Sequence, residues 1–128
     1  MDLIQRNFPN VGVVEGQLPE EVVDNIWKVV NEAREQPEDM KSELAGNISS
    51  SIRLDSQSPL LKNFVQEIIP SFMKSHMEAY GPPWRITMRE GERFNLESLW
   101  VNFQKKHEFN PPHDHSGVYS FVIWMQIP

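Results

Sequence analysis

The sequence predicts an α+β fold, with helices in the first part of the chain and strands in the second. Apolar residues recur at helical spacing over residues 19–37 and again over residues 58–81. After residue 84 they alternate with polar residues or form short aromatic and β-branched runs, which is typical of strands. The length of 128 residues suits a single domain, residues 1–128, with a hydrophobic core.

Composition and charge exclude several classes of partner. The formal net charge of -6 argues against nucleic acid and anionic membranes, because both favour clustered Lys and Arg. No apolar run approaches the roughly 20 residues that span a bilayer, and the N-terminal "MDLIQRNFPN" lacks the order of a signal peptide. We therefore expect a cytoplasmic protein. The chain has no cysteine, so any metal must be held by His, Asp or Glu.

The first predicted helix follows Pro19, which suits the first helical position, and ends before Pro37. Its acidic start complements the positive end of the helix dipole. One apolar stripe predicts the buried face: Val22, Ile26, Val30 and Ala33, broadened by Val23 and Trp27. Residues 38–57, rich in Ser, Asp and Asn, are then expected to form a connector.

The second predicted helix begins at Ser58 and Pro59 and stops at Gly81. Because an interior proline removes a helical hydrogen bond, Pro70 predicts a kink or two abutting helices. His76 lies near the apolar stripe and is expected to be a partly buried structural residue. The stripe itself comprises Leu61, Phe64, Val65, Ile68, Phe72, Met73 and Tyr80.

The second half of the chain predicts strands. Residues 84–104 alternate in polarity around a turn at Glu90 and Gly91, and they end in "LWVNF", where Trp100 and Asn102 share one face and Leu99, Val101 and Phe103 the other. Residues 105–117 read as a loop. The run "VYSFVIWMQIP" has apolar residues at both odd and even positions, so both faces of a strand here would be apolar. This predicts a strand buried on both sides.

The loop segment "PPHDHSG" carries the clearest chemical signal. On extended backbone, His113 and His115 point the same way with Cα atoms about 6.6 Å apart, so both imidazoles can converge on one divalent cation. Asp114 points the other way and would hydrogen-bond outside the ligand shell. The pattern also fits a plain polar turn, and both interpretations stay open.

With these residues in view, the chain resembles a family of iron(II)- and 2-oxoglutarate-dependent oxygenases of marine bacteria and cyanobacterial phages. The resemblance covers roughly the last two-thirds of the chain and rests on "ELAGNI" at 43–48, "LWVNF" and "PPHDHSGVYSFVIWMQIP". It implies a double-stranded β-helix, or jelly roll, preceded by helices. It also implies iron(II) at His113 and His115, with Asp114 as an alternative ligand, and a dioxygenase reaction that hydroxylates a small molecule as 2-oxoglutarate is decarboxylated. Trp100, Asn102 and Tyr119 would line the cosubstrate or substrate pocket.

The resemblance also predicts which parts of the family's domain this sequence contains. A jelly roll needs about eight strands, whereas the sequence offers about four, without counterparts of the family's distal histidine and cosubstrate-binding basic residue. We therefore expect the N-terminal part of a longer domain, with little turnover. We also expect self-association that buries Tyr119, Phe121, Ile123, Trp124 and Met125 between chains. The alternatives are a non-enzymatic binding or assembly module and a cupin-like metal-binding protein.

Overall fold

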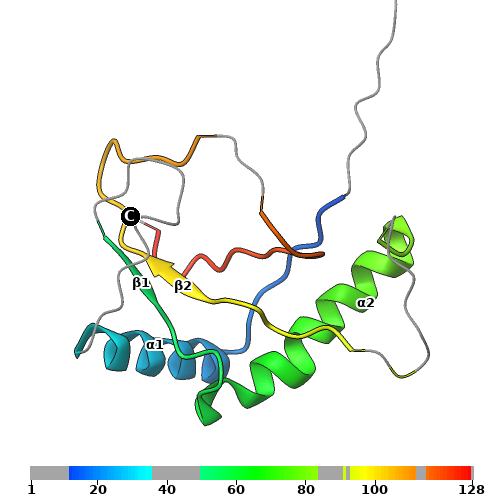
Figure 1. Ribbon diagram of the computed structural model, residues 1–128, viewed down its shortest axis with the longest axis horizontal. Coiled ribbons are helices and arrows are strands. Elements are labelled where there is room, and N and C mark those ends of the chain that lie inside the picture. The colour runs from blue at the N-terminus through cyan, green and yellow to red at the C-terminus, as the bar shows by residue number, and fades with distance from the viewer. Residues whose placement is uncertain (1–11, 36–49, 84–90, 92, 112–114, 128) are drawn as a thin grey trace, which may run out of the picture.

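The computed structural model describes residues 12–35, 50–83, 91, 93–111 and 115–127. Two α-helices and a two-stranded antiparallel sheet form its regular structure (Figure 1). The prediction of a mixed helix and strand fold is therefore confirmed. The described residues do not show a jelly roll, which stays a prediction.

Helix α1 spans Glu20–Glu35, as predicted. Its first turn is closed by the carbonyl oxygen of Pro19, which accepts hydrogen bonds from the amides of Val22 and Val23 at 3.0 and 3.1 Å. Val22, Ile26 and Val30 of the predicted stripe are buried. Val29 is also buried but was not predicted, although it lies three residues after Ile26 and therefore on the same face.

The second helical region consists of three consecutive pieces: the 3₁₀ turn η2 (Pro59–Leu61), the π-helical η3 (Phe64–Ile68) and helix α2 (Ile69–Tyr80). The prediction of abutting helices at Pro70 is confirmed. Proline cannot donate to a helical carbonyl, and here it lies in the first turn of α2, where no donor is needed. The wider π turn joins η3 to α2 through a bond from the amide of Ile69 to the carbonyl of Phe64. Gly81, with φ 84°, ends α2.

The sheet pairs β1 (Ser51–Arg53) with β2 (Trp100–Asn102), so that Ile52 lies opposite Val101. The prediction that residues 38–57 form only a connector was wrong for β1. Polar Ser51 and Arg53 alternate there with apolar Ile52 and Leu54, which is a strand pattern in a stretch too short to stand out. β2 confirms the predicted strand only over Trp100–Asn102, whereas residues 93–99, also expected to be extended strand, form none in the structure.

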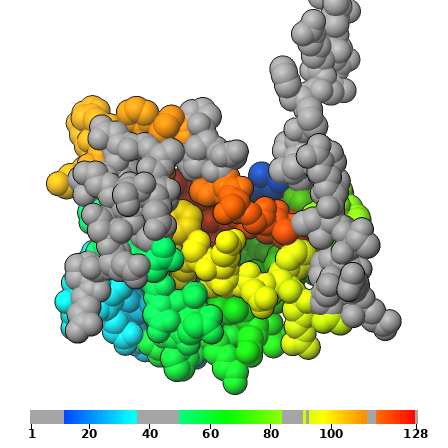
Figure 2. Space-filling view, in the orientation of Figure 1, coloured from blue at the N-terminus to red at the C-terminus, as the bar shows by residue number. Residues whose placement is uncertain are grey.

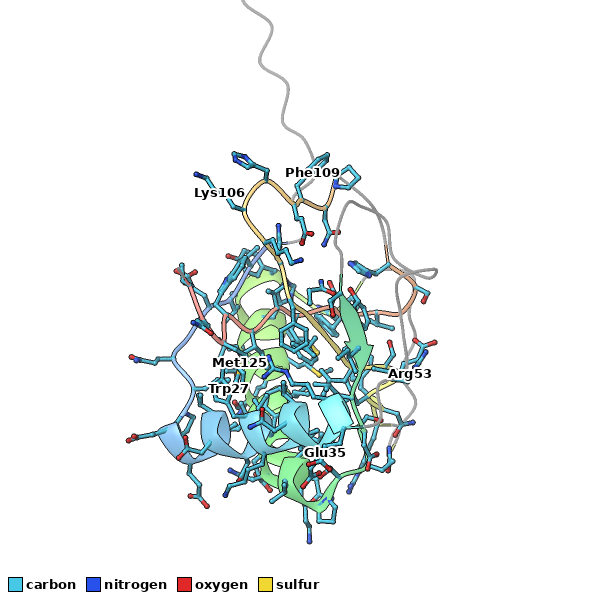
Figure 3. The ribbon with its side chains drawn as sticks, turned by 90° about the vertical axis from the view of Figure 1, so that its left-hand side faces the viewer. Trp27, Glu35, Arg53, Lys106, Phe109 and Met125 are labelled. Carbon is cyan, nitrogen blue, oxygen red and sulfur yellow. The ribbon has the colours of Figure 1, made fainter. Side chains whose placement is uncertain are left out.

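The hydrophobic core lies between α1, the η2 and η3 turns and one face of the sheet. Its buried members are Val22, Ile26, Val29, Val30, Leu54, Leu61 and Phe64. Leu99, Val101 and Phe103 pack against this cluster, which confirms their predicted common face. Figure 3 shows Lys106 and Phe109 on the loop at the end of the molecule far from α1.

The predicted final strand was wrong: residues 118–127 form no strand in the structure. The segment is not buried on both sides, because Val122, Trp124 and Ile127 are 72%, 76% and 74% exposed. Ile123 and Met125 nevertheless pack against the core. The physical reason is the absence of a ladder, since a strand needs a hydrogen-bonded neighbour and the described part of the chain supplies none here.

Some predictions fall outside the described residues. The strand expected over 84–90, the "ELAGNI" motif at 43–48 and Glu90 of the predicted turn belong to them. Gly91 does lie in a turn, with φ 84°. Among the described helices, none has the length and apolar character needed to cross a bilayer.

Candidate functional site

A large open cavity of about 2600 Å³ lies against the helices and the two long extended segments of the chain. Its walls come from α1, η3 and α2 and from residues 93–106 and 115–127. Four of the predicted site residues line it: Trp100, Asn102, His115 and Tyr119. Figure 2 shows the orange to red C-terminal segment crossing the hollowed middle of the face in view. The tertiary structure thus brings together residues separated by up to 19 positions.

Trp100 and His115 both line this cavity, and their rings lie near each other. Their ring centroids lie 6.1 Å apart with a tilt of 34° between the planes. Trp100 is on the face of β2 opposite the core, because its neighbours Leu99 and Val101 pack inward. His115 is exposed, and the indole of Trp100 lies beside its imidazole.

Asn102 is fixed by a residue that the sequence did not single out. The hydroxyl of Ser51 donates a hydrogen bond of 2.7 Å to Asn102 Oδ1 across the sheet register. Ser51 is only 2% exposed, whereas Asn102 is half-buried. The bond orients the Asn102 amide, and no described residue accepts a hydrogen bond from its two N–H groups. The Ser51 to Leu54 alternation was the one signal that could have indicated this partner.

Tyr119 lies in an aromatic cluster between α2 and residues 93–99. Its ring makes edge contacts with His76 and Phe94, at centroid distances of 5.4 and 5.6 Å. The buried hydroxyl has no hydrogen-bond partner among the described residues, and burial raises the pKa of Tyr119 above the usual 10.0. Tyr119 is therefore a neutral, unsatisfied donor beside the cavity.

His76 confirms the prediction of a partly buried structural histidine. Its Nε2 lies 3.3 Å from the carbonyl oxygen of Gly12, which can only accept, so Nε2 carries the proton. The ring also contacts Tyr80 at a centroid distance of 4.9 Å. The contact with Gly12 joins that residue to α2.

The charges on the cavity wall differ in sign from those of the whole chain. The formal net charge is -6, yet the charged residues that line the described part of the wall are four cations and two acids: Arg34, Arg93, Lys105, Lys106, Glu67 and Glu97. Arg34 is held against the ring of Phe103, with Cζ 4.3 Å from its centroid. No carboxylate pairs with Arg34 in the described part of the chain. Such a wall favours an anionic ligand.

The predicted metal ligands are only partly visible. His113 and Asp114 lie outside the described residues, so their geometry with His115 stays a prediction. Within the described ranges, no three His, Asp or Glu side chains gather at a possible metal position. His107 is exposed, and its backbone φ is positive, at 70°.

Comparisons of the chain with protein-family models, with curated proteins and with solved structures find no match. The geometry and chemistry of the cavity therefore carry the functional argument.

Proposed function

We propose that the chain carries part of an iron(II)- and 2-oxoglutarate-dependent oxygenase site of the jelly-roll type. The supporting observation is the cavity itself, because Trp100, Asn102, His115 and Tyr119 line one space whose charged wall is mainly cationic. A non-enzymatic turn would give no reason for these side chains to share a cavity.

In this proposal His113 and His115 hold the iron, with Asp114 as the alternative ligand. Imidazole and carboxylate are the ligand types of non-haem iron oxygenase sites. His115 fits this role because its ring is exposed at the cavity and supported by Trp100. Such support limits the rotation of the ligand and pre-organises the site.

The cavity also suits the dicarboxylate 2-oxoglutarate. Arg34 offers a guanidinium that no described carboxylate neutralises, and Asn102 offers amide donors that Ser51 orients. Tyr119 adds a hydroxyl that has no hydrogen-bond partner among the described residues. These residues would bind and orient the cosubstrate, while the apolar walls would receive an organic substrate.

When bound, iron(II) and 2-oxoglutarate supply oxidative chemistry that hydroxylates a substrate as the cosubstrate is decarboxylated. This chain's own contribution would be to hold the metal through imidazoles and to fix the carboxylates of 2-oxoglutarate.

Metal binding is tested by titrating the protein with iron(II) under anaerobic conditions and measuring the heat of binding by calorimetry. We expect His113→Ala and His115→Ala to weaken binding at least tenfold, because each removes one ligand. His107→Asn is the matched control, since His107 is exposed and Asn tolerates its positive φ. Equal binding by the parent and both alanine variants would refute the site.

The cosubstrate test uses the visible charge-transfer band that 2-oxoglutarate adds to an anaerobic iron complex. We expect Arg34→Gln to raise the 2-oxoglutarate concentration needed for half of the band, without changing the iron affinity. Lys28→Gln is the control, because Lys28 is an exposed cation of α1 that does not line the cavity. Iron binding without any band would favour the cupin-like alternative, and no iron binding would favour the non-enzymatic one.

A further inference from the structure

Residues 118–127 have the side-chain pattern of a strand but lack its hydrogen bonds. Ile123 and Met125 pack against the core, whereas the intervening Val122 and Trp124 are 72% and 76% exposed. Inward and outward side chains therefore alternate as in a strand. Within the part of the chain that the structure describes, no backbone group of this segment makes a hydrogen bond.

The composition of residues 118–127 is also that of a strand. It contains no charged residue and no proline, and most of its side chains are β-branched or aromatic. Proteins usually protect an exposed strand edge with Lys, Pro or a bulge, because an unprotected edge pairs with other chains. Neither Lys nor Pro is present in residues 118–127.

We infer that residues 118–127 pair with the same segment of a second copy of this chain, as antiparallel strands about a two-fold axis. A second copy fits better than a charged partner because the segment is uncharged within a chain of net charge -6. Two copies of an acidic protein repel each other least where their contact surface carries no charge. In a two-fold contact the same surface patch of each copy meets the other, so one segment can serve as both halves of the interface.

The pattern favours a register centred on Ile123. In that register Val122 lies opposite Trp124 of the second copy, which forms an aromatic and β-branched pair across the strands. Phe121 lies opposite Met125, and the sulfur can contact the ring. The outward apolar side chains, Val122 and Trp124, would then contact each other across the two-fold axis.

This arrangement differs from the one expected from the sequence. There, Tyr119, Phe121, Ile123, Trp124 and Met125 were expected to be buried between chains, and of these only Tyr119, Ile123 and Met125 need a different account. In the structure these three are half-buried within their own copy, so the contact depends on the backbone edge together with Val122 and Trp124.

The first test is sedimentation velocity of the full chain over a range of concentrations. We expect a monomer–dimer equilibrium that Val122→Lys weakens at least tenfold, because it places two like charges at the two-fold axis. Val13→Lys is the matched control, since Val13 is 74% exposed but lies outside the segment. Circular dichroism verifies that both variants fold.

The second test addresses the register. The chain has no cysteine, so an oxidised mixture of Val122→Cys and Trp124→Cys chains reports on this contact alone. Directly opposite residues lie about 4.5–5.5 Å apart, within disulfide range. We expect the mixed disulfide to form faster than either variant's own dimer.

Three results would overturn the inference. They are a parent that stays monomeric at every concentration, a Val122→Lys dimer as stable as the parent's, and equal weakening by Val13→Lys. A mixed disulfide no faster than either variant's own dimer would overturn the register. None of these outcomes depends on iron or 2-oxoglutarate, so the pairing and the proposed oxygenase function are tested separately.

Discussion

The bond between Ser51 and Asn102 connects the stability of the sheet to the cavity, and Ser51→Ala tests it. The substitution removes the hydroxyl that donates to Asn102 Oδ1 at 2.7 Å. A typical net contribution of such a bond is about 0.5–1.5 kcal/mol, and a buried acceptor left unsatisfied costs about 1–3 kcal/mol. Because Asn102 is only half-buried, water partly replaces the lost donor. We therefore expect a loss of about 1–2 kcal/mol in the free energy of unfolding.

The assay is urea denaturation of the parent, Ser51→Ala and Ser56→Ala. Ser56 is the control because its hydroxyl makes no hydrogen bond in the described part of the chain, so its loss should stay within about 0.5 kcal/mol. A double-mutant cycle with Asn102→Ala should give a coupling energy of about 0.5–1.5 kcal/mol. The reasoning is refuted if the two serine variants are equally stable or if the coupling is zero.

Two further predictions concern the core and the aromatic cluster. Leu61 is 1% exposed, so Leu61→Ala should cost about 2–5 kcal/mol in urea denaturation. The half-buried Leu60→Ala should cost clearly less, and equal losses would contradict the assigned core. Tyr119→Phe removes a buried hydroxyl without a described partner, so stability at pH 7 should stay equal or rise by up to about 1 kcal/mol. Burial raises the pKa of Tyr119 above 10.0 in the folded state, so the unfolded chain releases its proton first and the parent loses stability as the pH rises through 10. Denaturation at pH 8 and pH 10.5 should show a smaller loss for Tyr119→Phe, and identical losses would contradict the burial of the phenol.

The sequence was informative wherever a long periodic pattern coincided with clear end signals. α1 has sixteen residues of amphipathic repeat after Pro19, and Pro70 indicated the break before α2 because proline has no N–H to donate. β1 was missed because three residues are too few to establish an alternation. Its partner β2 lies about 50 positions away in the chain, and such a long-range pairing leaves no local trace.

For the candidate site too, some features could be predicted from the sequence and others could not. The sequence by itself determined the chemical groups: imidazoles at His113 and His115, the Trp100 and Asn102 pair on one strand face, and an uncharged C-terminal run. Only the tertiary structure decided that Ser51 orients Asn102, that Arg34 reaches the cavity wall beside Phe103, and that Val122 and Trp124 face outward. Residue type fixes what a side chain can donate, accept or bury. Which partner it finds depends on long-range packing, because the contacts that decide it join segments far apart in the chain.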